Sequence, residues 1–464
     1  MTNKKYIMII NERKIIESLE KHTKIDSGHI HAILTKALEL QGLDYDEVAM
    51  LTLIQDPELT QELFHTAEKI KNTIYGKRLV IFAPLYISNF CSNDCAYCAF
   101  RKTNSGLKRR ALSQSEIAVE TTNLINQGHK RILLLTGEDQ SENALEYVLE
   151  SIRTIYKTKT KHGEIRRLNV EIAPLTIEEF RQLKAENIGT YIVFQETYHR
   201  EIYKKFHPSG KKSDYDWRLE AMDRAMQADI DDVGIGVLFG LTDWRFELLA
   251  LIQHAEHLNK TYGVGPHTIS VPRLEPAFGS ELSSNPPNPV SDENFAKLIA
   301  ILRIAVPYTG IILSTRETPQ TRRKTLALGV SQISAGSRTN PGGYSEQKQN
   351  ASQFSLGDHR SLDEVIADVA SMGYIPSFCT ACYRLGRTGH DFMDLAKPGK
   401  IKDMCAPNAI ATFKEYLADY ASKSTKKIGE QLIQQEISIM PTEQRALTKT
   451  MLQKIENGEH DVFI

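Results

Sequence analysis

All six cysteines of the sequence fall into two groups of three, here called the first and second cysteine sets. The sets have the spacings C-x3-C-x2-C and C-x2-C-x22-C: Cys91, Cys95 and Cys98, then Cys379, Cys382 and Cys405. Thiolates are the usual protein ligands of iron–sulfur clusters, and a cubane of four irons takes four ligands. Three cysteines leave one iron open to a further ligand, which suits catalysis better than electron storage.

A zinc site is the alternative for such cysteines, and structural zinc sites normally close with four Cys or His ligands. No histidine lies near the first cysteine set in the sequence. In the second set, His390 lies between Cys382 and Cys405 and could complete a zinc site. The spacing indicates iron and sulfur for the first set and leaves the metal of the second set open.

The elements that position these cysteines follow a regular pattern. From residue 79 onward, short β-branched runs alternate with amphipathic stretches, as in parallel βα units. Eight strands are expected: Leu79–Ala83, Ile132–Leu135, Leu168–Ile172, Thr190–Phe194, Asp232–Leu238, Thr268–Val271, Gly310–Leu313 and Val330–Ile333. This span is close to the roughly 250 residues of a (βα)8 barrel. An open, doubly wound sheet is the alternative, but the Gly-x-Gly-x-x-Gly turn that would favour it does not follow the first strand.

The predicted fold is therefore α/β, with a TIM-type (βα)8 barrel over residues 79–341. A helical N-terminal extension (residues 1–78) precedes the barrel, and a mostly helical iron–sulfur domain (residues 342–464) follows it. Residues 342–356 are rich in Gly, Ser, Gln and Asn, which is typical of a linker or surface loop. Barrel enzymes carry their chemistry on the loops after the strands, and the first cysteine set follows the first strand.

The overall composition excludes several classes of protein. Lys and Arg number 57 against 58 Asp and Glu, so the net charge of −1 gives no reason to expect a nucleic acid or a membrane as partner. Six cysteines in 464 residues are too few for a disulfide scaffold. The apolar run at residues 6–10 is too short for a signal peptide, and no run approaches the roughly 18 residues of a membrane span. We expect a cytoplasmic protein.

The first cysteine set, with Tyr97 just before its last cysteine, resembles the cluster motif of the radical S-adenosylmethionine (SAM) enzymes. In that family the open iron of a [4Fe–4S] cluster is chelated by SAM, which is cleaved to methionine and a 5′-deoxyadenosyl radical. The resemblance implies SAM-binding roles for further residues that match family positions after the strands. They are Tyr97, Gly137 and Glu138 of Thr136-Gly137-Glu138, Glu171, Glu196 and Arg218. Thr136 departs from the family pattern, which has glycine there.

Both cysteine sets together resemble the HydG family, the radical SAM tyrosine lyases of [FeFe]-hydrogenase maturation, over essentially the whole chain. This resemblance implies cleavage of L-tyrosine to p-cresol and dehydroglycine. It also implies conversion of dehydroglycine to carbon monoxide and cyanide at a second [4Fe–4S] cluster, which carries an additional iron bound with cysteine. A ferredoxin or flavodoxin as electron donor, and other hydrogenase maturation proteins, are the implied partners. His267 is the implied ligand of the additional iron, and Arg273, Arg316 and Ser270 are the candidate substrate residues.

Two other functions compete with this interpretation. The tyrosine lyase of thiamine biosynthesis shares the barrel and stops at dehydroglycine, and it is not expected to carry the second cysteine set. A non-catalytic iron–sulfur carrier is the alternative from another class, but it needs no SAM pocket, so Gly137, Glu138 and Arg218 argue against it. The basic run at residues 102–110 is expected to be a solvated loop, or else a docking site for an acidic electron donor.

Overall fold

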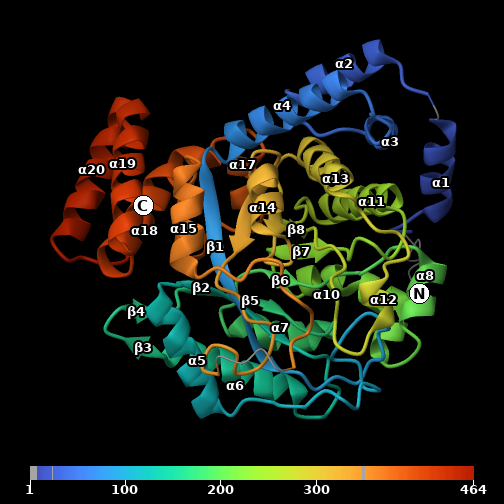
Figure 1. Cartoon of the computed structure of the whole chain (residues 1–464), viewed down its shortest axis with the longest axis horizontal. Coiled ribbons are helices and arrows are strands. Elements are labelled where there is room, and N and C mark those ends of the chain that lie inside the picture. The colour runs from blue at the N-terminus through green and yellow to red at the C-terminus, as the bar shows by residue number, and fades with distance from the viewer. Residues whose placement is uncertain (1–7, 23, 347–350) are drawn as a thin grey trace.

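A closed barrel of eight parallel strands forms the centre of the computed structural model, which describes residues 8–22, 24–346 and 351–464 (Figure 1). The barrel strands are β1 (Arg78–Ser88), β2 (Arg131–Thr136), β5 (Arg167–Glu171), β6 (Tyr191–Ile192), β7 (Val233–Gly236), β8 (Thr268–Ser270), β9 (Gly310–Leu313) and β10 (Val330–Ser334). Neighbours in this order pair in parallel, and β10 pairs back with β1, with Val80 opposite Gln332. The predicted TIM-type barrel is confirmed.

Helices surround the barrel because each strand is buried on both faces and needs an apolar cover. The covering helices are α5 (Gln114–Gln127), α6 (Ala144–Lys157), α7 (Ile177–Ala185), α8 (Arg200–Phe206), α9 (Tyr215–Leu219), α10 (Ala221–Gln227), α11 (Trp244–Tyr262), α12 (Glu281–Ser284), α13 (Asp292–Ala305), α14 (Pro319–Leu326) and α15 (Leu362–Ser371). Capping boxes start α5, α7 and α15, where Ser or Thr bonds the N3 amide and Glu returns the bond. A 3₁₀ turn, η1 (Lys211–Ser213), precedes α9.

All eight expected strands are present, with shifted bounds, and three short strands were not expected. A hairpin of β3 (Lys159–Thr160) and β4 (Gly163–Glu164) follows α6. The third, β11 (Ile375–Ser377), pairs with the first residues of β1 and so extends the barrel sheet. At two or three residues each, these strands are too short to give a periodic sequence signal.

Helices lie at both ends of the chain (Figure 1). At the N-terminus α1 (Glu12–Lys21), α2 (Ser27–Ala37), α3 (Tyr45–Leu51) and α4 (Pro57–Ile74) cover α11 and α13 of the barrel. After β11 come α16 (Ala381–Arg384), α17 (Gly389–Ala396), α18 (Ile401–Asp419), α19 (Lys423–Ile439) and α20 (Thr442–Glu456). Residues 1–7 of the expected extension and residues 347–350 of the expected linker lie outside the described residues.

Strand β1 is the longest strand, with 11 residues, and it connects the two ends of the barrel. Its first residues, Arg78 to Val80, pair with β11, which runs directly into the second cysteine set. Its last residues pair with β2 up to Ser88, three residues before Cys91. The two cysteine sets therefore lie at opposite ends of the barrel, the first at the C-terminal ends of the strands and the second at their N-terminal ends.

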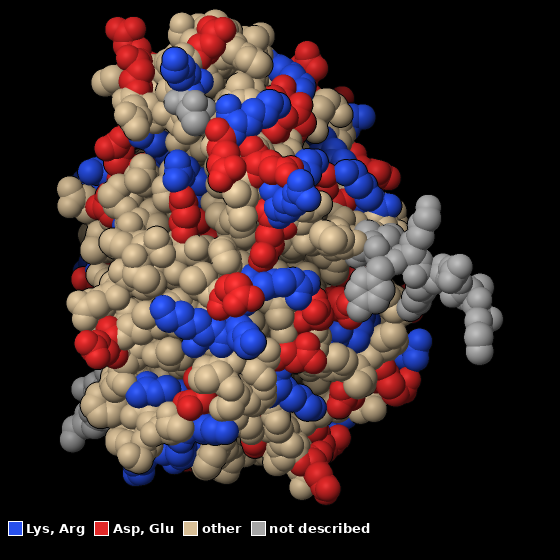
Figure 2. All heavy atoms as spheres, turned by 90° about the vertical axis from the view of Figure 1, so that its right-hand side faces the viewer, with Lys and Arg blue, Asp and Glu red and all other residues tan. Residues whose placement is uncertain are grey.

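One face of the molecule carries mixed charge. Figure 2 shows acidic and basic side chains interspersed over the face on the right of Figure 1, without a large field of one sign. Among the helices that the structure describes, none has both the length and the apolar character needed to cross a membrane.

Candidate active site

The first cysteine set lines a cavity of about 100 Å³ at the C-terminal end of the barrel. All three thiols are free. Burial raises the pKa of Cys91 and Cys98 to about 11 and that of Cys95 to about 12. Buried thiols of this kind stay neutral unless a cation binds them, and a bound metal deprotonates them. The donor set therefore fits a cationic iron–sulfur cluster.

The loop that carries the first cysteine set is held by an arginine. Arg109 donates hydrogen bonds to the carbonyl oxygens of Asn89 (2.8 Å), Phe100 (2.7 Å) and Arg101 (2.5 Å), on both sides of the three cysteines. Arg110 pairs with Glu116 and Glu346. The expectation of a simply solvated basic run at residues 102–110 is wrong for these arginines, because closing the loop requires donors for its carbonyl groups.

Four charged side chains lie together beside the thiols: Glu138, Glu196, Lys212 and Arg218. Arg218 Nη1 lies 2.8 Å from Glu138 Oε1, and Lys212 Nζ lies 2.6 Å from Glu196 Oε1. Burial opposes the ionisation of Glu138, but Arg218 and Lys212 outweigh it and lower the pKa of this carboxyl. The arrangement offers cations to a carboxylate and carboxylates to an ammonium group, which are the two charged ends of an amino acid.

Gly137 is required where it stands. A Cβ at this position would lie 2.2 Å from the carbonyl oxygen of Phe90, the residue before Cys91. The predicted Thr136-Gly137-Glu138 segment thus touches the cluster loop backbone directly. Glu196 also has an unusual backbone, with φ 70°, a left-handed conformation that a residue other than glycine adopts at a cost, often at functional sites.

Three residues of this site were missed from the sequence. Asn93 is fully buried and donates from Nδ2 to Glu138 Oε2 (2.8 Å), while its Oδ1 accepts from the amide of Lys212 (3.0 Å). His207 Nε2 lies 2.8 Å from the hydroxyl of Tyr97, which borders the same cavity. The only sequence signal for Lys212 as a site residue was its position six residues before Arg218. Residues that lie between motifs or beside them are recognised only when the fold brings them to the site, because their spacing in the sequence gives no signal.

A second cavity, of about 80 Å³, lies in the barrel interior and borders the first. Glu171, Arg316 and Ser270 line it, so three predicted residues meet here. Burial, followed by the charge of Glu196, raises the pKa of Glu171 to about 7. The guanidinium of Arg316 stacks on the ring of Phe354 at 3.3 Å, which leaves a half-buried cation facing the cavity. This chamber is suited to a small zwitterion.

The structure places the other candidate arginine elsewhere. Arg273 makes ion pairs with Glu317 and with Asp292, the latter at 2.8 Å, and it lies over the ring of Phe295 on α13. Unlike Arg316, Arg273 does not line the interior cavity or the cavity of the first cysteine set. The structure thus brings Arg316 to the interior cavity and gives Arg273 a structural environment.

The mouth of the barrel is covered by residues 351–357, of which residues 351–356 belong to the segment expected to be a linker. Tyr86 donates to the side chain of Gln353 (2.7 Å), and the amide of Ser355 donates to the carbonyl of Pro276 (2.8 Å). The amide of Gly357 bonds the carbonyl of Thr315 (2.9 Å). The segment is therefore tied to β1 and to the loops after β8 and β9, and it closes that half of the mouth.

The second cysteine set lines a cavity of about 40 Å³ at the opposite end of the barrel. His267, Asp232 and three arginines, Arg78, Arg131 and Arg387, share its wall. Several of their polar atoms are buried without a hydrogen-bond partner among the described residues: Nε of each arginine, Nδ1 of His267 and Oδ2 of Asp232. Buried polar groups are normally satisfied, so these atoms indicate a site built for a polar or metal-containing group.

His267 lies in this wall with its Nδ1 3.5 Å from Asp232 Oδ1. Burial lowers the pKa of His267, so the ring stays neutral and keeps a lone pair for a metal. His390, the candidate zinc ligand, is exposed and lies against Gly263. Across residues 8–22, 24–346 and 351–464, no three His, Cys, Asp or Glu side chains come close enough to hold a single metal ion.

Comparison with known proteins identifies the family. Residues 85–252 match the model of the radical SAM superfamily, and residues 270–375 match the biotin and thiamin synthesis associated domain. A crystal structure of HydG, a maturase of the [FeFe]-hydrogenase, superposes with a TM-score of 0.95 at 50% identity, covering 98% of this chain and 100% of that one. The chain belongs to the HydG-like radical SAM family.

Two further relatives bear on the branch within the superfamily. HydG from Carboxydothermus hydrogenoformans, another family member, has a TM-score of 0.84 and 42% identity, covering 95% of this chain and 97% of its own. The 2-iminoacetate synthase of Salmonella typhimurium is 32% identical over 351 residues, which are 75% of this chain and 90% of the relative. The HydG-like family thus accounts for nearly the whole chain, and the synthase for three quarters of it.

Proposed function

We propose that this chain is a radical SAM lyase that cleaves the Cα–Cβ bond of L-tyrosine and converts the amino acid fragment to carbon monoxide and cyanide for hydrogenase maturation. The observation that carries the proposal is the pair of three-cysteine sites at opposite ends of one barrel, with the half-buried Arg316 in a cavity between them. The first site serves the cleavage and the second serves the conversion of the fragment.

At the first site Cys91, Cys95 and Cys98 would hold a [4Fe–4S] cluster with SAM on its open iron. When bound, these two groups supply the 5′-deoxyadenosyl radical that removes a hydrogen atom from the substrate. Arg218 and Lys212 receive the carboxylate of SAM, and Glu138 and Glu196 receive its ammonium and ribose groups. Since these side chains already pair with one another, SAM finds its polar partners preorganised rather than exposed to water.

In the interior cavity Arg316 binds the carboxylate of L-tyrosine. Its guanidinium is fixed by Phe354, and a fixed fork recognises a carboxylate in one orientation. Glu171 borders both this cavity and the first, so its carboxyl lies between cofactor and substrate. With a pKa raised to about 7, it can take a proton from the substrate ammonium group. Ser270 offers a hydroxyl on the same wall.

At the second site Cys379, Cys382 and Cys405 would hold an auxiliary cluster, and His267 would bind the additional iron with cysteine. Dehydroglycinate, HN=CH–COO⁻, gives carbon monoxide, cyanide and water with atoms and charge in balance. The three arginines of this site offset the negative charge of the thiolates and of cyanide. An iron carrying carbonyl and cyanide ligands then leaves as the product.

The test is a product assay on the whole chain, reconstituted anaerobically with iron and sulfide and given SAM, L-tyrosine and dithionite. We expect p-cresol, carbon monoxide and cyanide. The double variant Cys379→Ala, Cys382→Ala should keep p-cresol and lose carbon monoxide. Equal loss of both products would contradict two separate sites, and absence of p-cresol from the wild type would favour an iron–sulfur carrier.

A 2-iminoacetate synthase is the second candidate, because such an enzyme is 32% identical to this chain over 351 residues. It would make p-cresol and release the iminoacetate without forming carbon monoxide. Wild-type protein with both cysteine sets loaded that yields p-cresol alone would favour this candidate.

A further inference from the structure

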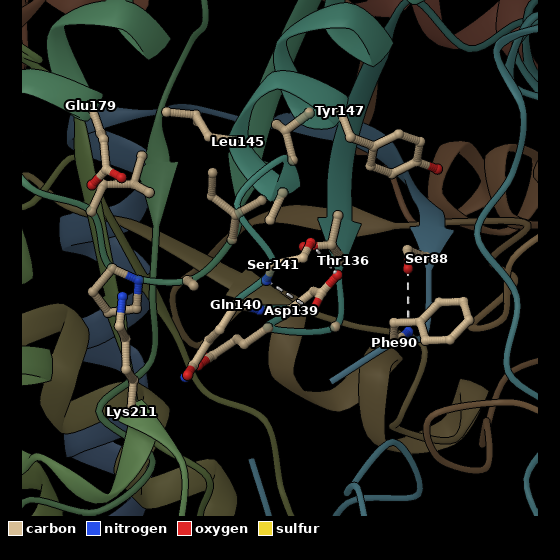
Figure 3. Close-up of a pocket in the computed structure, with 18 of the residues that line it drawn as sticks. Ser88, Phe90, Thr136, Asp139, Gln140, Ser141, Leu145, Tyr147, Glu179 and Lys211 are labelled. Atoms are coloured by element: carbon tan, nitrogen blue, oxygen red, sulfur yellow. Dashed lines mark hydrogen bonds between the residues drawn. The ribbon is translucent and has the colours of Figure 1, made fainter. Parts of the chain in front are cut away.

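A further cavity, larger than the three described above, enters the mechanism only through residues of its inner wall. It has a volume of about 640 Å³ and lies beside the first cysteine site, between the loop after β2, the start of α6, the loop after β5 and the η1–α9 segment (Figure 3). Glu179 and Lys211 lie on one side of it and Phe90 and Tyr147 on the other. We call this cavity the vestibule.

The vestibule adjoins the cavity of the first cysteine set. The two cavities share their inner wall: Thr136, Gly137, Glu138, Ile172, Lys212 and Arg218. The same Arg218–Glu138 pair that faces the thiols thus also forms the inner end of the vestibule.

On the opposite side of the barrel mouth, hydrogen bonds hold the covering segment in place. Residues 351–357 tie β1 to the loops after β8 and β9, and the amide of Ala99 beyond the last cysteine bonds the carbonyl of Gln353 (3.4 Å). The vestibule lies on the β2–β5 side, away from these ties. Its volume falls within the roughly 300–1,000 Å³ of small-molecule sites, so a nucleoside-sized molecule fits inside it.

The chemistry of the vestibule walls also fits a particular molecule. Its solvent-exposed rim has acidic residues Asp139, Glu142 and Asp214 against Lys211, and Glu179 adds a further carboxylate. SAM has a sulfonium, an ammonium and one carboxylate and is a net cation, whereas methionine and 5′-deoxyadenosine have no net charge. An acidic rim attracts SAM and does not retain the products. The apolar wall, which includes Leu145 and Tyr147, suits the adenine ring.

We infer that the vestibule is the route by which SAM enters and the cleavage products leave, with the Arg218–Glu138 pair at its inner end. The inference rests on the proposed function, since it assumes that SAM binds beside the first cysteine set. It concerns the passage of SAM through the vestibule, whereas the residues of the shared inner wall also bind SAM in the proposed function. Narrowing a passage changes the barrier between two states without changing their free energies, so association and dissociation slow by the same factor.

The test uses Leu145→Trp and Ser141→Trp, which place a large side chain on two walls of the vestibule, and Glu150→Trp on the exposed side of α6 as control. Binding of radiolabelled SAM to reconstituted whole chain is followed by rapid filtration without reductant, so that no cleavage occurs. We expect both rate constants of the two vestibule variants to fall about tenfold, equivalent to a barrier about 1.4 kcal/mol higher, with Kd unchanged. Glu150→Trp should match the wild type.

Other outcomes overturn the inference in different ways. Unchanged rates in both vestibule variants would mean that SAM enters elsewhere. A raised Kd with unchanged association would make the cavity part of the bound site. Ser141 lies on an exposed loop, so Ser141→Trp decides the matter if Leu145→Trp disturbs the packing of α6. Wild-type protein that binds no SAM would overturn the proposed function itself. If the wild type binds SAM and the vestibule variants have the same rate constants, only the role of the vestibule as the route of SAM is overturned.

Discussion

Replacing Gly137 by alanine should disable the SAM site while leaving the barrel folded. The new Cβ would lie 2.2 Å from the carbonyl oxygen of Phe90 and 2.9 Å from its carbonyl carbon, where ordinary contacts begin near 3.4 Å. These are backbone atoms one residue before Cys91, so the clash is relieved only by moving the cluster loop or the segment that holds Glu138. Overpacking of this kind costs typically about 1–3 kcal/mol, which corresponds to about 5- to 150-fold in an equilibrium constant.

We expect Gly137→Ala to weaken SAM binding by a factor in this range, measured as Kd with the oxidised, reconstituted protein. The matched control is Gly28→Ala on α2, where the nearest atom to the new Cβ is the carboxylate of Asp26 at an ordinary 3.4 Å. That variant should bind SAM like the wild type. If Gly137→Ala keeps the wild-type affinity for SAM and the wild-type cluster spectra, the argument that the Thr136-Gly137-Glu138 segment touches the cluster loop is refuted.

Three more predictions follow from the site. Arg316→Met should raise the KM for L-tyrosine by tenfold or more with SAM affinity unchanged, whereas Arg273→Met should lower the Tm and leave KM near wild type; the reverse pattern would exchange their roles. Arg109→Ala removes three hydrogen bonds from the first cluster loop, so iron should be lost from the first site. The loss is measured by EPR in a Cys379→Ala, Cys382→Ala background. An unchanged EPR signal would mean that Arg109 does not hold the loop. Because burial raises the pKa of Glu171 from 4.5 to about 7, the folded state holds this proton more tightly, and stability falls as pH rises across that range by about 3 kcal/mol. The Tm of Glu171→Gln should lack this part of the pH dependence, and equal slopes in both proteins would contradict it.

The sequence was a good guide wherever a local pattern determines structure. The eight strands, the two cysteine sets and the residues directly after strands, such as Glu138 and Arg316, follow from periodicity and from the rule that barrel loops carry the chemistry. The pairing of Arg273 with Glu317 could not be foreseen, because an arginine after a strand has the same signature whether its carboxylate comes from the protein or from a ligand.

Contacts between distant segments were also beyond the sequence. Residues 351–357 have the composition of a linker, yet they cover the barrel mouth because Tyr86 and the loops after β8 and β9 supply partners for their polar groups. Lys212 and Asn93 reach Glu138 from separate loops, and only the closed barrel brings those loops together. The pairing of β11 with β1, which fixes the second cysteine set at the far end, depends on three residues.

Strand β1 has a consequence for how far apart the two sites can be. Its alternate residues from Val80 to Ser88 line, in turn, the second cysteine cavity, the interior cavity and the vestibule. With a rise of about 3.3 Å per residue, the 11 residues act as a ruler of about 36 Å between the ends of the barrel. Inserting or deleting one residue would turn this row of side chains toward the helices, because the period of a strand is two. The separation of the two sites can therefore change only in steps of about 7 Å, and we expect relatives to keep the length of this strand or alter it by pairs of residues.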